Sequence, residues 1–191
     1  QGGIPVFAVY STFLQRAYDM LLHDAAIDNL HVIFCVDRAG LVGDDGETHH
    51  GVFDVAYLNT IPNMTVLAPA SFAELEVMLE RALFQLTGPV AVRYPRGGEG
   101  GYMGTAGEGP AAILRQGNDI TLVGYGTEMN DILEAADLLE KQGVQAEVIK
   151  LNQLSPLVSD LVEQSVRKTR VMLVAEEQAS QGCVGQRLAA R

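Results

Sequence analysis

The sequence predicts an α/β protein made of two consecutive parallel-sheet units. Short apolar runs typical of buried strands alternate with helical patterns along most of the 191 residues. A glycine-rich stretch at residues 97–110 divides this alternation into two parts. Hydrophobic residues make up 48% and charged residues 19% of the chain, which is typical of a globular protein with a filled core.

The first unit is predicted over residues 1–96. Strands are expected at 5–9, 32–36, 64–67 and 90–93, and helices at 13–26 and 71–85. The first helix has apolar residues at three- and four-residue spacing, and Ser71 with Glu74 forms a capping-box signature for the second. Because short strands are separated by helices, we expect a parallel sheet covered on both faces.

The second unit is predicted over residues 111–191. Strands are expected at 120–123, 146–149 and 171–174, and helices at 129–142 and 159–168. The stretch at 97–110 is too poor in apolar residues to form a regular element, so it is interpreted as an interdomain linker. The chain starts almost directly on a strand and ends within a helical pattern. We therefore expect the first unit to lack its N-terminal part and the second its C-terminal end.

Charge and composition limit the classes of partner. A net charge of −11 argues against nucleic acid and anionic membranes. The sequence contains no apolar run near the ~20 residues of a membrane span. Two cysteines, Cys35 and Cys183, form no disulfide framework, which favours a reduced, cytoplasmic setting.

The loop at residues 37–51 is the first candidate site. It follows a predicted buried strand and combines glycines, acids, an arginine and two histidines. Open α/β sheets bind ligands at the carboxyl ends of their strands, which favours a functional loop. An acid–base or substrate-binding role for a histidine fits the pattern, and a solvated acidic loop is the alternative. The run Gly43–Gly46 resembles a magnesium motif, but the asparagine expected near residues 69–74 is absent, so no metal ligand is assigned.

Two further groups of residues follow predicted strands. Phe13 and Arg16 share one face of a helix start just after Tyr10, which would suit a planar ring and a phosphate. The alternative is that Phe13 is a core residue and Arg16 a surface charge. Arg93 and Arg96 could bind an anion bidentately, or form an exposed basic turn. Residues 176–178 could cap a helix or contact the other domain.

Taken together, four ordered motifs resemble the 1-deoxy-D-xylulose-5-phosphate synthases. These motifs are Tyr10–Asp19 (YSTFLQRAYD), Asp37–Gly40 (DRAG), Asp45–Gly51 (DGETHHG) and Arg93–Gly97 (RYPRG). These enzymes belong to the transketolase-type thiamine-diphosphate enzymes. The resemblance implies condensation of pyruvate with D-glyceraldehyde 3-phosphate and release of carbon dioxide, a step that feeds isoprenoid, thiamine and pyridoxal biosynthesis.

The resemblance also implies roles for individual residues. Phe13 would pack on the aminopyrimidine of thiamine diphosphate. Arg16 and Arg96 would hold the phosphate of the aldehyde. The substrate site would be lined by Tyr10, Asp45 and His49. Arg93 and His50 are left without an assigned role.

By the same resemblance, this chain corresponds to most of the pyrimidine domain and most of the transketolase C-terminal domain of a homodimer. The activating glutamate, the diphosphate domain and the Mg²⁺ ligands would lie outside it. We therefore expect the isolated chain to be inactive and to self-associate. Two alternatives remain open: a half-enzyme like the beta subunit of pyruvate dehydrogenase, and a non-catalytic module that binds a phosphorylated metabolite or another subunit.

Overall fold

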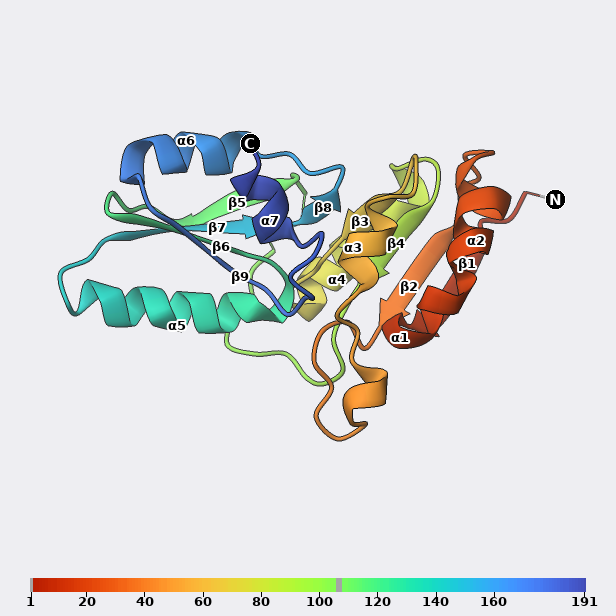
Figure 1. Cartoon of the computed structure of the whole chain (residues 1–191), viewed down its shortest axis with the longest axis horizontal. Coiled ribbons are helices and arrows are strands. Elements are labelled where there is room, and N and C mark those ends of the chain that lie inside the picture. The colour runs from red at the N-terminus through yellow and green to blue at the C-terminus, as the bar shows by residue number, and fades with distance from the viewer. Residues whose placement is uncertain (1, 106–107) are drawn as a thin grey trace.

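The computed structural model of the chain describes residues 2–105 and 108–191 (Figure 1). Two sheets lie side by side, each with helices on both faces, and the predicted α/β class with two parallel-dominated sheets is confirmed. Residues 106 and 107 of the predicted linker lie outside the described part of the chain. Within the described ranges, no helix is both long and apolar enough to span a bilayer.

The first sheet has five strands in the order β1-β2-β4-β3-β8. These are β1 (Val6–Tyr10), β2 (Ile33–Asp37), β4 (Val90–Arg93), β3 (Thr65–Leu67) and β8 (Gln153–Ser155). The four strands that the sequence predicts are parallel to one another. The fifth strand, β8, was not predicted: it comes from the second half of the chain and pairs antiparallel with β3.

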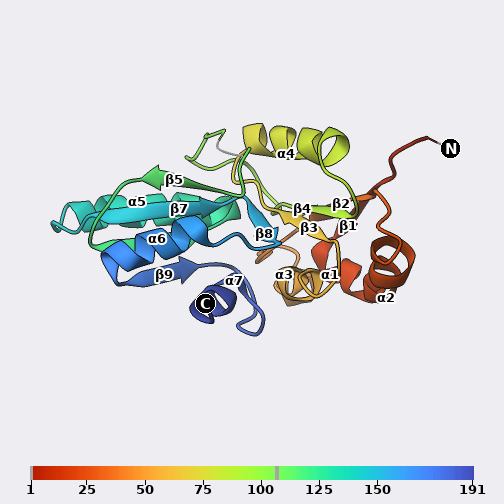
Figure 2. The same cartoon turned by 90° about the horizontal axis from the view of Figure 1, so that it is seen from above.

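Helices cover both faces of this sheet (Figure 2). One face carries α4 (Phe72–Phe84), and the other carries α1 (Ser11–Leu14), α2 (Tyr18–Met20) and α3 (Asp54–Leu58). The predicted cap of α4 is confirmed, since Ser71 Oγ accepts a hydrogen bond from the Glu74 N–H at 3.1 Å. The single helix predicted at 13–26 is instead a succession of short α, 3₁₀ and π segments from Ser11 to Ala26. Its apolar spacing predicted which face is buried but not this irregularity.

The second sheet has the order β5-β7-β6-β9. Its strands are β5 (Ala111–Arg115), β7 (Ala146–Leu151), β6 (Ile120–Gly124) and β9 (Met172–Ala175). The three predicted strands are parallel, whereas β5 was not predicted and pairs antiparallel with β7. Helices α5 (Met129–Glu140) and α6 (Asp160–Thr169) lie on opposite faces, and α7 (Val184–Ala189) ends the chain (Figure 1).

One hydrophobic core runs through both units. It joins Leu14 and Leu58 of the first unit to Tyr125, Ile149 and Leu151 of the second, and all five side chains are fully buried. The sheets are therefore packed as one body, with no solvent layer between them at this point.

A buried ion pair also crosses between the units. Lys150 Nζ on β7 lies 2.8 Å from Glu74 Oε2 on α4, and neither side chain is exposed. The same carboxylate accepts hydrogen bonds from the Ala70 N–H and the Tyr102 hydroxyl. Burial lowers the pKa of Lys150, and the charge of Glu74 acts against that shift. The carboxylate of the first unit thus favours the charged form of a lysine of the second.

Replacing Lys150 with methionine should lower the free energy of unfolding by about 3–5 kcal/mol, because the Glu74 charge stays buried without its cation. The midpoint of urea denaturation, followed by circular dichroism, measures this loss. The matched control is Arg167→Met, since Arg167 pairs with Glu163 at 3.8 Å on the surface. That change should lower the stability by less than about 1 kcal/mol. Equal losses of unfolding free energy in the two variants would contradict the larger contribution expected from the buried pair.

Candidate active site

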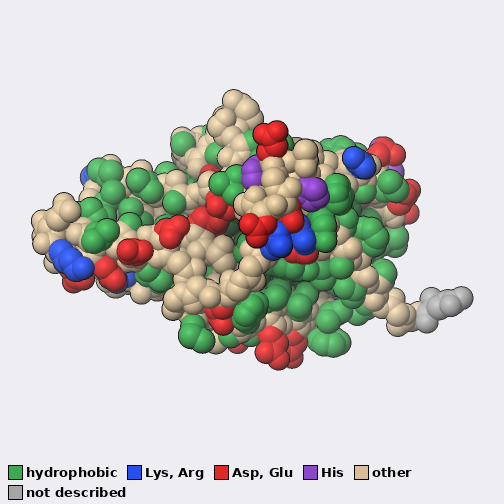
Figure 3. Space-filling model, turned by 90° about the horizontal axis from the view of Figure 1, so that it is seen from below, with side chains coloured by type: hydrophobic (Ala, Val, Ile, Leu, Met, Phe, Trp, Pro, Cys, Tyr) green, Lys and Arg blue, Asp and Glu red, His purple; other side chains and the backbone are tan. Residues whose placement is uncertain are grey.

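The candidate site lies at the carboxyl edge of the first sheet. The parallel register sets Tyr10 of β1 beside Asp37 of β2, and Val36 of β2 beside Arg93 of β4. The loops that follow these strands therefore leave the sheet at one edge. Viewed from below, histidine, acidic and basic side chains gather near the middle of one face (Figure 3).

An aromatic cluster forms the first part of the site. Tyr10 ends β1 and Phe13 lies in the helix that follows at once, so their rings stack with centroids 5.7 Å apart. His49 from the loop meets the Phe13 ring edge-on at 5.5 Å, and the guanidinium of Arg16 lies 5.8 Å from the centre of the same ring. Phe13 is 41% exposed, so it is not the core residue of the alternative interpretation.

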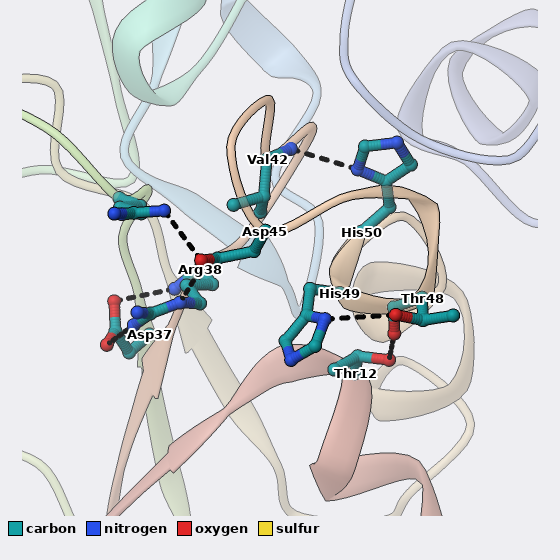
Figure 4. A network of polar contacts seen from close by, with 9 residues as sticks. Thr12, Asp37, Arg38, Val42, Asp45, Thr48, His49 and His50 are labelled. Carbon is teal, nitrogen blue, oxygen red and sulfur yellow. Dashed lines mark hydrogen bonds and ion pairs between the residues drawn. The ribbon is translucent and has the colours of Figure 1, made fainter.

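A cluster of arginines and carboxylates forms the second part (Figure 4). Arg38 Nε donates to Asp45 Oδ2 at 2.6 Å, and Arg96 Nη1 donates to Asp45 Oδ1 at 2.7 Å. Arg38 also pairs with Asp37 at 2.9 Å. Each oxygen of the Asp45 carboxylate thus has an arginine of its own. The hydrogen bond from Arg38 holds the pKa of Asp45 below its usual value, so this carboxylate is ionised at neutral pH.

Arg38 joins the two parts of the site. Its guanidinium carbon lies 3.8 Å above the centre of the Tyr10 ring, a cation–π contact. A continuous chain of contacts therefore links all six residues predicted from the sequence: Tyr10, Phe13, Arg16, Asp45, His49 and Arg96. Arg38 lies in the DRAG motif, but no role for it was predicted from the sequence.

The loop at residues 37–51 is closed at its neck. Gly40 and Gly51 exchange two backbone hydrogen bonds, of 2.9 and 2.8 Å. Gly51 packs so tightly that a Cβ there would overlap the Arg38 carbonyl and Ser11. His50 Nδ1 accepts the Val42 N–H at 2.9 Å, so this ring supports the loop.

The loop also holds His49 in place. Thr12 Oγ1 donates to the Thr48 carbonyl at 3.0 Å, which fastens the loop to the start of the first helix (Figure 4). The Thr48 hydroxyl lies 3.0 Å from His49 Nδ1. With that nitrogen engaged and the ring packed on Phe13, Nε2 is the ring nitrogen left for a ligand.

Arg93 does not belong to this site, so the hypothesis that it binds an anion together with Arg96 is wrong. Its side chain is 5% exposed, and its Nε lies 2.9 Å from Asp54 Oδ2, a carboxylate with no exposure. The guanidinium also lies 5.4 Å from the centre of the Tyr125 ring of the second unit. Arg93 is part of the interface between the units. No sequence signal linked it to Asp54, which lies 39 residues earlier.

The segment after β9 contacts the first unit, as one of the two interpretations of residues 176–178 predicts. Glu177 Oε2 accepts the Leu41 N–H at 2.9 Å, and Gln178 Nε2 donates to Asp54 Oδ1 at 3.0 Å. Glu176 fits the other interpretation, because it accepts hydrogen bonds from two N–H groups at the start of α7.

Of the parts of thiamine diphosphate, the aminopyrimidine ring is the one that this site could contact. Phe13 is 41% exposed, and aromatic rings pack well on planar heterocycles. By contrast, the described residues include no group of three or more His, Cys, Asp or Glu side chains that could hold a metal ion. Phe13 is suited to pack on a planar ring such as an aminopyrimidine.

Fold and site together define the class of protein: two α/β units of transketolase type, with an aromatic and arginine-rich site at the edge of the first. A model of the transketolase pyrimidine binding domain matches residues 1–98, and a model of the transketolase C-terminal domain matches residues 109–191. The chain belongs to the transketolase family.

Within this family the chain is similar to 1-deoxy-D-xylulose-5-phosphate synthases. It is 47% identical over 186 residues to the enzyme of Chlorobaculum tepidum, and 44% identical over 195 residues to that of Crocosphaera subtropica. These alignments take in 95% and 99% of the chain but 29% and 31% of the two relatives. The chain thus spans about three tenths of the length of these relatives.

Solved structures share the fold. A split-gene transketolase, described as an inactive beta4 tetramer, superposes with a TM-score of 0.90 and is 29% identical. That match covers 99% of this chain and 62% of the other. A transketolase variant from Pichia stipitis, 21% identical, superposes with a TM-score of 0.78 over 93% of this chain and 27% of its own.

Stability should depend on pH through Glu128, at the interface of the units. Burial raises the pKa of Glu128 from its ordinary 4.5 to about 7, the Arg93 charge lowers it, and Glu177 raises it. Because the folded-state pKa is raised, the folded chain binds more protons than the unfolded chain between these values. Stability should therefore fall as pH rises from 4.5 to about 7 and stay low above it.

In Glu128→Gln this part of the pH dependence should vanish, so the variant should be more stable than the parent above pH 7 and equal to it near pH 4.5. Calorimetric melting temperatures between pH 4.5 and 8.5 measure the difference. Glu134→Gln, a change at an exposed position of α5, the helix that begins directly after Glu128, is the control. Parallel curves for the Glu128 variant and the parent would refute this assignment.

Proposed function

We propose that this chain forms the pyrimidine-binding and C-terminal parts of a 1-deoxy-D-xylulose-5-phosphate synthase. The observation that carries the proposal is the single connected cluster of the six residues that the family resemblance had assigned. Identities of 47% and 44% to named synthases support the same conclusion. We further propose a boundary within residues 97–110 between the two domains.

The phosphate of D-glyceraldehyde 3-phosphate is proposed to bind Arg16 and Arg96. A cavity of about 320 Å³ lies beside this cluster, with Arg38 and Arg96 in its wall. Arg96 is 41% exposed and bound through one nitrogen to Asp45, so most of its donor groups remain for an incoming anion. A forked, permanently charged guanidinium suits a phosphate dianion.

The reacting carbonyl and hydroxyl groups are proposed to meet Tyr10, Asp45 and His49. His49 can donate or accept a proton at Nε2, since its Nδ1 is engaged by Thr48. Asp45 is proposed to orient substrate hydroxyls as an ionised acceptor. The Tyr10 ring stacks on the Phe13 ring and helps to hold it in position.

Thiamine diphosphate, when bound, supplies the nucleophilic carbon and the electron sink for decarboxylation. This chain would orient the aminopyrimidine through Phe13. The diphosphate and its Mg²⁺ would be held by residues outside this chain, and the activating glutamate would be one of the residues outside it. We propose a homodimeric enzyme in the reducing cytoplasm, in keeping with the free cysteines Cys35 and Cys183.

Carbon dioxide release from labelled pyruvate tests the proposal. The assay uses the complete polypeptide that the native gene encodes, with thiamine diphosphate and Mg²⁺, and with or without D-glyceraldehyde 3-phosphate. We expect release to be strongly stimulated by the aldehyde, whereas the 191-residue chain alone should give none. Release that ignores the aldehyde, or no release with saturating cofactor, would overturn the proposed activity.

In the complete polypeptide, Arg96→Ala should raise the KM for D-glyceraldehyde 3-phosphate roughly ten- to a hundredfold and leave the KM for pyruvate nearly unchanged. A hydrogen bond to a charged group contributes about 1.5–3 kcal/mol, which corresponds to that range. Steady-state kinetics with each substrate varied in turn measures the effect. Arg167→Ala removes a surface arginine of the second unit and should change neither constant. A similar rise for both substrates would refute the phosphate assignment.

A second candidate is a half-enzyme that takes its diphosphate domain from a separate chain. The match with the split-gene transketolase, over 99% of this chain, favours it. Native mass spectrometry of the complex purified from its source distinguishes the two. One kind of polypeptide, about three times the length of this chain, supports the single-chain synthase, and two kinds support the half-enzyme.

A further inference from the structure

The second unit forms a hydrogen bond with the start of the loop at residues 37–51. Glu177, two residues after β9, accepts the Leu41 N–H on its Oε2 at 2.9 Å. Gly40 makes this approach possible. Its φ is +90°, and a Cβ at that position would overlap the Glu177 carboxylate. The glycine of the DRAG motif therefore makes room for a side chain of the other unit.

The same segment forms hydrogen bonds with the end of the loop. Gln178 Nε2 donates to the Gly51 carbonyl at 3.4 Å, and the Ala179 N–H donates to the Val52 carbonyl at 2.8 Å. Gln178 also donates to Asp54, the partner of Arg93. Three consecutive residues, Glu177 to Ala179, which we call the clamp segment, thus hold both sides of the loop neck.

Apolar packing holds part of the clamped end of the loop, since Ala39 is 4% and Val42 is 2% exposed. Leu41, whose N–H binds Glu177, is 57% exposed. Polar contacts also tie the loop to the first unit: the Ala39 N–H donates to the Tyr94 carbonyl at 3.0 Å, Thr12 binds the Thr48 carbonyl, and Arg96 binds Asp45. The clamp segment adds three polar contacts from the second unit to those that hold the neck.

We propose that Glu177 and its clamp segment are positioning elements, through which the second unit sets the place of Asp45 and His49 in the active site. None of the six site residues comes from the second unit, so this segment would be its contribution to the reaction. The kinetic part of the inference rests on the proposed function, whereas the structural part does not.

Glu177→Ala in the complete polypeptide tests the proposal. We expect hydrogen–deuterium exchange in peptides covering residues 37–51 to become about tenfold faster, with the exchange of α5 and α6 unchanged. The kcat of the synthase reaction should fall about tenfold. Glu177→Gln keeps an acceptor oxygen for the Leu41 N–H and should restore most of the slow exchange and most of kcat.

Two further variants separate positioning from general loss of structure. Glu134→Ala removes an exposed carboxylate of the same unit and should leave both readouts unchanged. Gly40→Ala should speed loop exchange by pushing against the Glu177 carboxylate. Its effect should shrink in the Glu177→Ala background, because part of the clash is then gone. If Glu177→Ala fails to fold, Glu177→Asp, which withdraws the carboxylate by one methylene, provides the same comparison.

The exchange rate of the loop and the additivity of the two changes decide whether the clamp exists. Unchanged loop exchange in Glu177→Ala overturns the clamp, and so does faster exchange spread evenly over both units. Fully additive effects of the Gly40 and Glu177 changes also overturn it. If the parent protein releases no carbon dioxide, the proposed function fails, and the exchange and additivity data still decide the clamp. Selective, non-additive loosening of the loop supports it.

Discussion

The whole arrangement depends on a charge pair that neither unit could bury alone. Glu74 on α4 and Lys150 on β7 are both fully buried, and each would lose its counter-charge if the units slid against one another without separating. A buried pair adds little net stability compared with apolar packing, but a broken one is strongly unfavourable. Its expected effect is therefore on geometry: it favours the placement of the second sheet in which the two charges meet. The contacts of the clamp segment with the loop depend on that placement.

The site gathers several cations in an acidic protein. The chain has a net charge of −11, yet Arg16, Arg38 and Arg96 gather at one edge of the first sheet. Asp45 keeps two of these cations in place by binding one with each carboxylate oxygen. An anionic ligand would meet guanidinium groups that are already oriented, so less side-chain entropy is lost on binding. The acidic surroundings would at the same time disfavour anions elsewhere on the surface.

The sequence predicted those parts of the molecule that depend on local patterns. Seven parallel strands follow from apolar periodicity, and the Ser71 cap follows from capping chemistry. The six candidate site residues, which the structure brings together, were chosen through the resemblance of their motifs to a known family. The parts it missed depend on partners far away in the chain. β8 is three residues long and is a strand only because β3 offers it an edge, and β5 likewise depends on β7. In the sequence, Arg93 resembles a residue of a surface anion site. In the structure, Asp54 and Tyr125 surround it at the interface between the units.

The pairing of β3 with β8 has a consequence for how the protein is made. Val66 pairs with Ser155, so the edge strand of the first sheet is supplied by residues that leave the ribosome long after the rest of that sheet. Contacts between such distant residues raise the contact order and slow folding. Until then β3 lacks its partner on that side of the sheet, and unpaired strands are prone to aggregation. Emergence of residues 153–155 from the ribosome is the step that lets β3 pair.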